Sequence, residues 1–222
     1  YNPKNSVDNN EQINIVENKE QILTNMRIGI SDFDNINPII SQNRDIINLS
    51  SIIYEPLLTL SEDYQLELAL AKEYSKINEK TYIVKLKDDL KWEDGTAITG
   101  KDVQFTVDKL KQGKSIYSDN AKNIKSVEII DVSTVRFNLN KEKNFFEYNL
   151  IFPIISSSQF SGEKDFFKSR LAPISSGKYK VKSASVDSME LVKNYNWYGN
   201  KEKEPRIDNI KIIFYGAMGD AY

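Results

Sequence analysis

The stretch that decides the fold, residues 86–111, reads LKDDLKWEDGTAITGKDVQFTVDKLK. The residues that lead into it alternate between two faces, with Tyr82, Val84 and Leu86 on one of them, and this alternation predicts a strand. Glu93-Asp94-Gly95 then predicts a tight turn, because Gly adopts the positive φ that such a turn needs and Asp can bond its own backbone.

A capped helix is predicted after the turn. The Thr99 hydroxyl can accept a hydrogen bond from the N–H three residues on, and the Asp102 carboxylate can bond back to the backbone of Thr99. The positions that share one helical face from there are Val103, Thr106, Val107 and Leu110. The stretch is therefore predicted to be strand, turn and capped helix in immediate succession.

Residues 91–106 (KWEDGTAITGKDVQFT) closely resemble the W/F-x-D-G-x-P-x-T-A-x-D-V-x-F-S stretch of family 5 extracellular solute-binding proteins. These are the oligopeptide, dipeptide and nickel binding components of ABC importers. Further matches follow in the family's order between Met26 and Phe214: INP at 36–38, IYEPLL at 53–58, SGKY at 176–179, NYNWYG at 194–199 and PRIDNIKIIF at 205–214. The sequence departs from the pattern at Glu67 and Asn196, where Pro is usual, and at Tyr74, where Trp is usual.

The rest of the chain predicts short strands and few helices. Alternating residues predict a strand at 26–30, a hairpin at 127–139, a second hairpin at 179–191 and a strand at 207–214, and helical spacing predicts a short helix at 46–53. The apolar run 145–155 predicts a short helix followed by a buried or crossing strand, and 158–171 a loop with one helical turn.

Two motif-like segments are rejected. Counted from Asp32, an EF-hand would need Gly at the sixth position and Glu at the twelfth, but Asn37 and Asn43 stand there. Gly177-Lys178 lacks the upstream Gly and the following Ser or Thr of a phosphate-binding loop. The sequence therefore offers neither a calcium loop nor a P-loop.

Composition limits the chemistry. The chain of 222 residues has 40% hydrophobic and 28% charged residues and a net charge of −2, which is ordinary for a globular protein, and no basic stripe indicates nucleic acid binding. It contains no Cys and no His, which excludes thiol nucleophiles, thiolate or His-ligated metal sites and Ser-His-Asp catalysis within these residues.

Catalysis would have to use carboxylates, Lys or Tyr. A pair of acids, as in glycoside hydrolysis, has no distinctive spacing here. Asp88-Asp89 and Glu93-Asp94 flank a turn and are better explained as solvated turn residues. We therefore predict no enzyme, no catalytic residue, no metal site and no cofactor.

The resemblance implies an α/β (mixed α+β) fold of the periplasmic-binding-protein type II class, present here as an N-terminal portion without a third lobe. The expected organisation is a flexible tether at 1–21, a discontinuous first lobe at 22–45 plus 150–215, an inserted second lobe at 46–149, and the start of a connection to the missing lobe at 216–222. The chain opens on a polar stretch that lacks the apolar segment of a signal peptide, and this is expected to be a mature or trimmed start.

The resemblance also implies a function. The chain is expected to be a substrate-binding component of an ABC importer, a monomer lipid-anchored on the outer face of the cytoplasmic membrane of a Gram-positive cell, which passes oligopeptides to permease subunits. By position, Gln42, Asn43 and Arg44 align with the segment that pairs with peptide backbone, and Tyr117 with an aromatic that faces ligand. The alternatives are a helix-entry loop and a surface cap for these residues, and for the protein a non-peptide solute (nickel complex, heme, oligosaccharide) or an adhesion module.

Overall fold

The computed structural model describes residues 24–31, 33–199 and 204–216. Strands dominate its secondary structure, joined by two longer helices and several single turns of helix. In chain order the elements are β1 (Asn25–Ile30), α1 (Arg44–Ile53), β2 (Leu58–Leu60), β3 (Leu66–Leu68), β4 (Ala71–Asn78), β5 (Thr81–Leu86), α2 (Gly100–Leu110), α3 (Ser118–Ala121), β6 (Ile124–Ile129), β7 (Thr134–Leu139), η1 (Phe146–Asn149), η2 (Phe166–Lys168), β8 (Tyr179–Ala184), β9 (Ser188–Lys193) and β10 (Asn209–Phe214).

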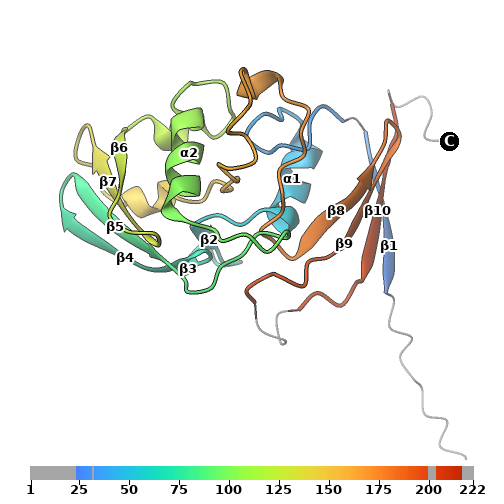
Figure 1. Cartoon of the computed structure of the whole chain (residues 1–222), viewed down its shortest axis with the longest axis horizontal. Helices are drawn as coiled ribbons and strands as arrows, with labels where there is room; N and C mark the ends of the chain where they lie inside the picture. Colours follow the sequence, from blue (N-terminus) through green and yellow to red (C-terminus); the bar gives the residue numbers. More distant parts are fainter. Residues whose placement is uncertain (1–23, 32, 200–203, 217–222) are drawn as a thin grey trace, which may run out of the picture.

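The strands form two larger sheets, which lie at opposite ends of the molecule in Figure 1. One has the order β1-β10-β9-β8, with β1 parallel to β10 and the other pairs antiparallel. The other has the order β4-β5-β7-β6 and is antiparallel throughout. The pair β2-β3 forms a small separate sheet. The predicted strand at 26–30, both hairpins and the final strand are confirmed.

Two hydrophobic cores lie beside these sheets. The face of α2 that the sequence singled out, with Val103, Val107 and Leu110, is fully buried in a core shared with β5 and β7. Helix α1 buries Ile46, Leu49 and Ile53 in a second core with β8, β9 and β10. The predicted helix at 46–53 is confirmed and begins two residues earlier, at Arg44.

The deciding stretch folds as predicted. Gly95 has φ +84°, and its N–H donates to the carbonyl of Trp92 (2.9 Å), closing the turn. Helix α2 begins with a complete capping box between Thr99 and Asp102. Asp102 also reaches outside the helix, because its second carboxylate oxygen accepts the main-chain N–H and the hydroxyl of Ser157, both at 2.8 Å. Local sequence therefore explains one half of this carboxylate's bonds.

Segment 145–155 contains the predicted short helix, as the single turn η1, but the predicted strand after it is wrong, because 150–155 forms only one isolated bridge, between Pro153 and Pro56. After η1, the Leu58 N–H donates to the Leu150 carbonyl (3.1 Å), and the Ile154 N–H donates to the Glu55 carbonyl (3.0 Å). The loop at 158–171 contains the single helical turn η2. Segment 150–155 carries buried side chains into the α2 core, among them Phe152 and Ile155.

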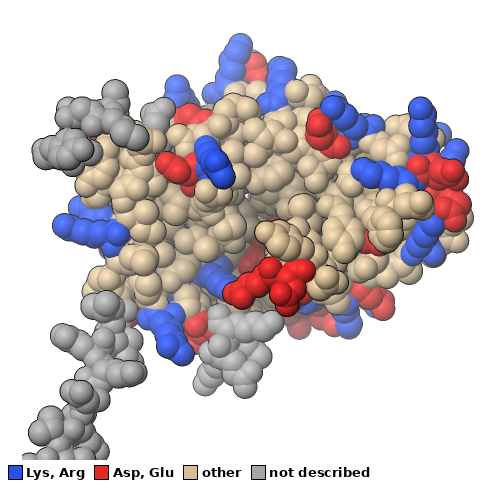
Figure 2. All heavy atoms as spheres, turned by 180° about the vertical axis from the view of Figure 1, so that it is seen from behind, with Lys and Arg blue, Asp and Glu red and all other residues tan. Residues whose placement is uncertain are grey.

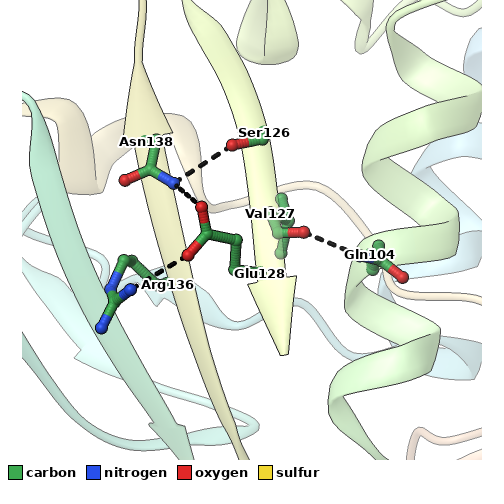
Figure 3. A network of polar contacts seen from close by, with 6 residues as sticks. All are labelled: Gln104, Ser126, Val127, Glu128, Arg136 and Asn138. Carbon is green, nitrogen blue, oxygen red and sulfur yellow. Dashed lines mark hydrogen bonds and ion pairs between the residues drawn. The ribbon is translucent and has the colours of Figure 1, made fainter. Parts of the chain in front are cut away.

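Polar contacts cover the outer face of the β6–β7 hairpin (Figure 3). The Glu128 carboxylate accepts from Arg136 (3.0 Å) and from Asn138 (2.7 Å), which also donates to the Ser126 hydroxyl. On the other side, the Gln104 side chain donates from α2 to the Val127 carbonyl (2.7 Å). That bond ties the helix to β6, an edge strand, and occupies a carbonyl on it.

The predicted lobe boundaries at 45/46 and 149/150 stay a prediction. By core membership, α1 packs with the sheet of β1 and β8–β10, and Leu150 to Phe166 contribute to the α2 core. The predicted tether at 1–21 and nearly all of 216–222 lie outside the described residues. Within the described ranges, no helix has the length and apolarity needed to cross a bilayer.

Candidate functional site

The loop between β1 and α1 is organised by the carboxylate of Asp34. It accepts the main-chain N–H of Asn35 (2.6 Å) and of Gln42 (2.6 Å), and also bonds to the Ser41 hydroxyl and the Asn43 N–H. Partial burial opposes ionisation of this group, but these bonds outweigh it and hold the pKa of Asp34 below its usual value. An ionised Asp34 therefore shapes the predicted ligand-binding loop from inside.

The three predicted loop residues have different surroundings. Asn43 is half-buried and caps α1, since its side-chain oxygen accepts the N–H of Asp45 (2.8 Å) and of Ile46 (3.2 Å). Gln42 and Arg44 are exposed. Of the three, the side chains of Gln42 and Arg44 are thus the ones that face solvent, while that of Asn43 serves the helix.

The structure brings Gln42 close to the loop that carries Tyr117. The Gln42 side chain donates to the main-chain carbonyl of Lys114 (3.3 Å), 72 residues further along the chain. Tyr117 is half-buried against the α2 core, and its phenol is hydrogen-bonded to Ser50 on α1. Burial raises the pKa of Tyr117 and the bond to Ser50 lowers it, so the phenol stays protonated at neutral pH. Two predicted segments from different parts of the chain therefore form one corner.

A cavity of about 350 Å³ opens beside this corner. The Asn35 side chain donates to the Ser169 carbonyl (2.9 Å) across it, and the Lys114 ammonium lies 5.3 Å from the ring centroid of Phe167. The residues that line it carry both charges and one aromatic ring: Asp34, Asn35, Ile40, Phe167, Lys168, Ser169 and Arg170. Its size falls within the range of small-molecule sites.

Sequence reasoning missed most of this lining. Asp34 falls within the segment that the sequence rules out as a calcium loop, and residues 167–170 fall within the predicted loop at 158–171. One local signal was available: Ser41 and Asn43, two residues apart before an apolar helical pattern, mark a capped loop that needs an acceptor at its centre. No local pattern indicated that 167–170 would come alongside.

A second cluster joins the YEP and NYNWYG motifs. The Glu55 carboxylate accepts the indole N–H of Trp197 (2.9 Å), 142 residues away, and the hydroxyl of Tyr198 (3.3 Å). Lys178 lies 5.3 Å from the Trp197 ring centroid, and Lys87 lies 4.3 Å from that of Tyr198. Burial raises the pKa of Glu55, while the two hydrogen bonds and the two lysines act in the opposite direction. The cluster bridges segments from both ends of the fold.

Charge is evenly distributed on the face shown in Figure 2. Lys and Arg side chains alternate there with Asp and Glu, and no extended basic patch is visible. That distribution agrees with the net charge of −2 and gives this face no electrostatic footprint for nucleic acid.

Comparison with known proteins identifies a sequence family and relatives of this chain. The chain matches the sequence model of the bacterial extracellular solute-binding proteins, family 5 Middle, over residues 65–219. Among curated proteins it is similar to the probable peptide-binding protein YejA of Agrobacterium fabrum, with 26% identity over 85% of this chain and 33% of that protein. The chain thus spans about a third of the length of the curated relatives it matches.

Two solved structures share the fold. NikZ from Campylobacter jejuni, crystallised with Ni(L-His), gives a TM-score of 0.75 at 27% identity, over 86% of this chain and 39% of that one. The ABC transporter substrate-binding protein CtaP from Listeria monocytogenes gives 0.73 at 29% identity, over 87% and 41%. The mixed α+β architecture is therefore that of type II periplasmic binding proteins. The motifs in order and the family match together establish that this chain belongs to the family 5 bacterial extracellular solute-binding proteins.

Proposed function

We propose that the chain is part of the substrate-binding component of an ABC importer that captures extracellular oligopeptides and delivers them to a membrane permease. The observation that carries this proposal is the corner where Gln42, the 114–117 loop and the adjacent cavity meet. Family membership supports the solute-binding role, and similarity to a probable peptide-binding protein and to an ABC transporter substrate-binding protein supports the peptide and the importer.

The corner suits ligands of varied sequence. Asp34 occupies the main-chain N–H groups of Gln42 and Asn43, so we assign contact with peptide backbone to the exposed side chains of Gln42 and Arg44. The Gln42 amide can both donate and accept, and the Arg44 guanidinium donates to carbonyl or carboxylate oxygens. Tyr117 supplies a half-buried aromatic wall. Contacts of this kind do not depend on the ligand's side chains.

The remaining parts follow from this role. The two lobes predicted from the resemblance, 22–45 plus 150–215 and 46–149, would face a third lobe outside this chain across the ligand. Residues 1–21 would serve as the spacer to a lipid anchor, and the protein would act as a monomer without catalysis or cofactor. A non-peptide cargo is the second candidate, favoured by the similarity to NikZ, which was solved with a nickel–histidine complex.

The test compares this chain with a form extended to the full length of its relatives. Small molecules released from each by denaturation are identified by mass spectrometry. Heterogeneous short peptides from the extended form, and none from this chain, are expected. A single non-peptide compound would keep the fold and change the cargo. Release of nothing, with no thermal stabilisation by any peptide pool, would refute the transport role.

Variants of the extended form locate the site. Gln42→Ala and Arg44→Ala are each expected to weaken peptide binding about tenfold, which corresponds to one lost charge-assisted or paired hydrogen bond. Asn48→Ala is the matched control, because Asn48 is an exposed residue one turn further along α1. Calorimetric titration with a defined peptide gives the dissociation constants. If all three variants bind the peptide as tightly as the natural protein, the corner is not part of the binding site.

A further inference from the structure

A second cavity, of about 310 Å³, lies at the far end of the β4-β5-β7-β6 sheet and plays no part in the proposed importer role. Strand β4 is an edge of that sheet, and Tyr74 and Lys76 project from it on the face shared with Val84 and Tyr82 of β5. The cavity lies between this face and the turn that begins η1. Its lining is Tyr74, Lys76, Tyr82, Asn144, Phe145 and Glu147.

The cavity displays aromatic rings to solvent. Phe145 is 71% exposed although it belongs to the most apolar run of the sequence, and its neighbour Phe146 is fully buried against Tyr82. The backbone of Phe145 has φ +56°, a left-handed conformation that is unusual for a bulky side chain. Its ring meets that of Tyr148 edge-on at 6.3 Å. Most of the Phe145 ring is therefore accessible at the wall of the cavity, beside Tyr74, and is available to a ligand.

The polar groups of the lining are balanced in charge. Lys76 and Glu147 contribute one charge of each sign, and Lys76 is also paired with Glu79 (2.6 Å). The opposite charges of Lys76 and Glu147 give the lining no single sign of charge that would select an ionic ligand. Asn144 adds an amide that both donates and accepts. The lining therefore suits an uncharged ligand that carries donors and acceptors around an apolar surface.

Addition of a protein strand is disfavoured at this edge. The pairing of β4 with β5 is interrupted by irregularities at Ala71/Glu73 and at Lys76/Asn78. Such bulges, together with Lys72 and Lys76 on the edge itself, are features that prevent strands of other chains from pairing there. A small ring that packs flat on an aromatic face needs no free strand edge.

We propose that this cavity is a carbohydrate-binding site that takes one neutral pyranose ring of a saccharide. The C–H face of the sugar packs on the rings of Phe145 and Tyr74, because the C–H hydrogens of the sugar carry partial positive charge and the aromatic face carries partial negative charge. Lys76, Asn144 and Glu147 bond its hydroxyl groups. The site is separate from the corner at Gln42, which contains none of these residues.

Saturation-transfer NMR on the intact chain tests the proposal. The probes are the methyl β-glycosides of glucose, N-acetylglucosamine and mannose, the corresponding β-linked tetramers, and tetramethylammonium as a cationic probe. Binding of at least one glycoside through its ring C–H protons is expected. If a tetramer binds more tightly than the single-ring glycoside, the bound ring belongs to a polymeric glycan. If the two bind equally, the site takes a free sugar. Binding of tetramethylammonium and of no glycoside would overturn the proposal.

Variants assign the signal to this cavity. Phe145→Ala is expected to weaken glycoside binding about fivefold, the effect of losing one stacked ring. Tyr64→Ala is the matched control, because Tyr64 is also an exposed aromatic (77%) with a positive φ (58°), but lies in the β2–β3 turn. Asn144→Ala, at an exposed position, gives a second reading that does not depend on the folding of the Phe145 variant. Glycoside binding unchanged in both cavity variants would refute the assignment.

Discussion

Asp102 offers a quantitative test of how the fold is held together. The side chain is 3% exposed and its carboxylate accepts four hydrogen bonds. One oxygen accepts from the N–H (2.8 Å) and hydroxyl (3.2 Å) of Thr99, and the other accepts from the N–H and hydroxyl of Ser157, both at 2.8 Å. Asp102→Ala removes all four and leaves the two N–H groups without these partners.

The size of the effect separates two interpretations. If Asp102 served only as the capping-box partner, its loss would cost about 1 kcal/mol. The bonds to Ser157 involve a charged acceptor in a water-poor site, and such bonds add about 1.5–3 kcal/mol. We therefore expect Asp102→Ala to lower the free energy of unfolding by about 2.5–4 kcal/mol.

Urea unfolding followed by fluorescence measures this free energy, since Trp92 is fully buried (1% exposed) and reports on the α2 core. Asp108→Ala is the control: Asp108 is an exposed acid on the same helix, and its loss is expected to change stability by less than about 0.5 kcal/mol. A loss of no more than about 1 kcal/mol for Asp102→Ala would refute the role of the Ser157 contact.

Three further predictions use the same assay. Gly177→Ala is expected to destabilise the protein by about 1–3 kcal/mol, because a Cβ there would lie 2.7 Å from the main chain at the end of α1. Gly162→Ala is the control and should be neutral, because a Cβ at that position meets open space. Equal effects of the two substitutions would contradict this packing. Burial raises the pKa of Glu55 above 4.5, so protonation favours the folded state: this contribution is complete below pH 4.5 and is lost as pH rises through the folded-state pKa. Relative to Glu55→Gln, the natural protein should therefore lose stability as the pH rises above 4.5, and a flat difference would show that the carboxylate is not desolvated. For Asp34, the hydrogen bonds outweigh partial burial and lower the pKa below 3.8, so its contribution to stability is present above pH 3.8 and is lost as pH falls through the folded-state pKa. Asp34→Asn should therefore cost more stability at pH 6 than near pH 3. The reverse order would contradict the assignment.

The candidate site could be predicted only in part. The resemblance pointed to Gln42, Asn43, Arg44 and Tyr117, and their role in ligand binding stays a prediction. The structure adds that Gln42 contacts the loop of Tyr117, and that the Asn43 side chain caps α1. These facts depend on which segments meet, which a single sequence pattern does not encode.

Local signals alone determined the strand, turn and capped helix around residues 86–111, both hairpins and the short helix before YEP. They succeed because backbone propensity, capping and turn chemistry act over a few residues. Only the tertiary structure decided that Ser157 completes the bonds of Asp102, that Glu55 meets Trp197 and that β1 pairs in parallel with β10. It also placed Phe145 in solvent while its neighbour Phe146 is buried. Such outcomes are set by the competition of distant segments for the same buried space, and no short stretch of sequence contains that information.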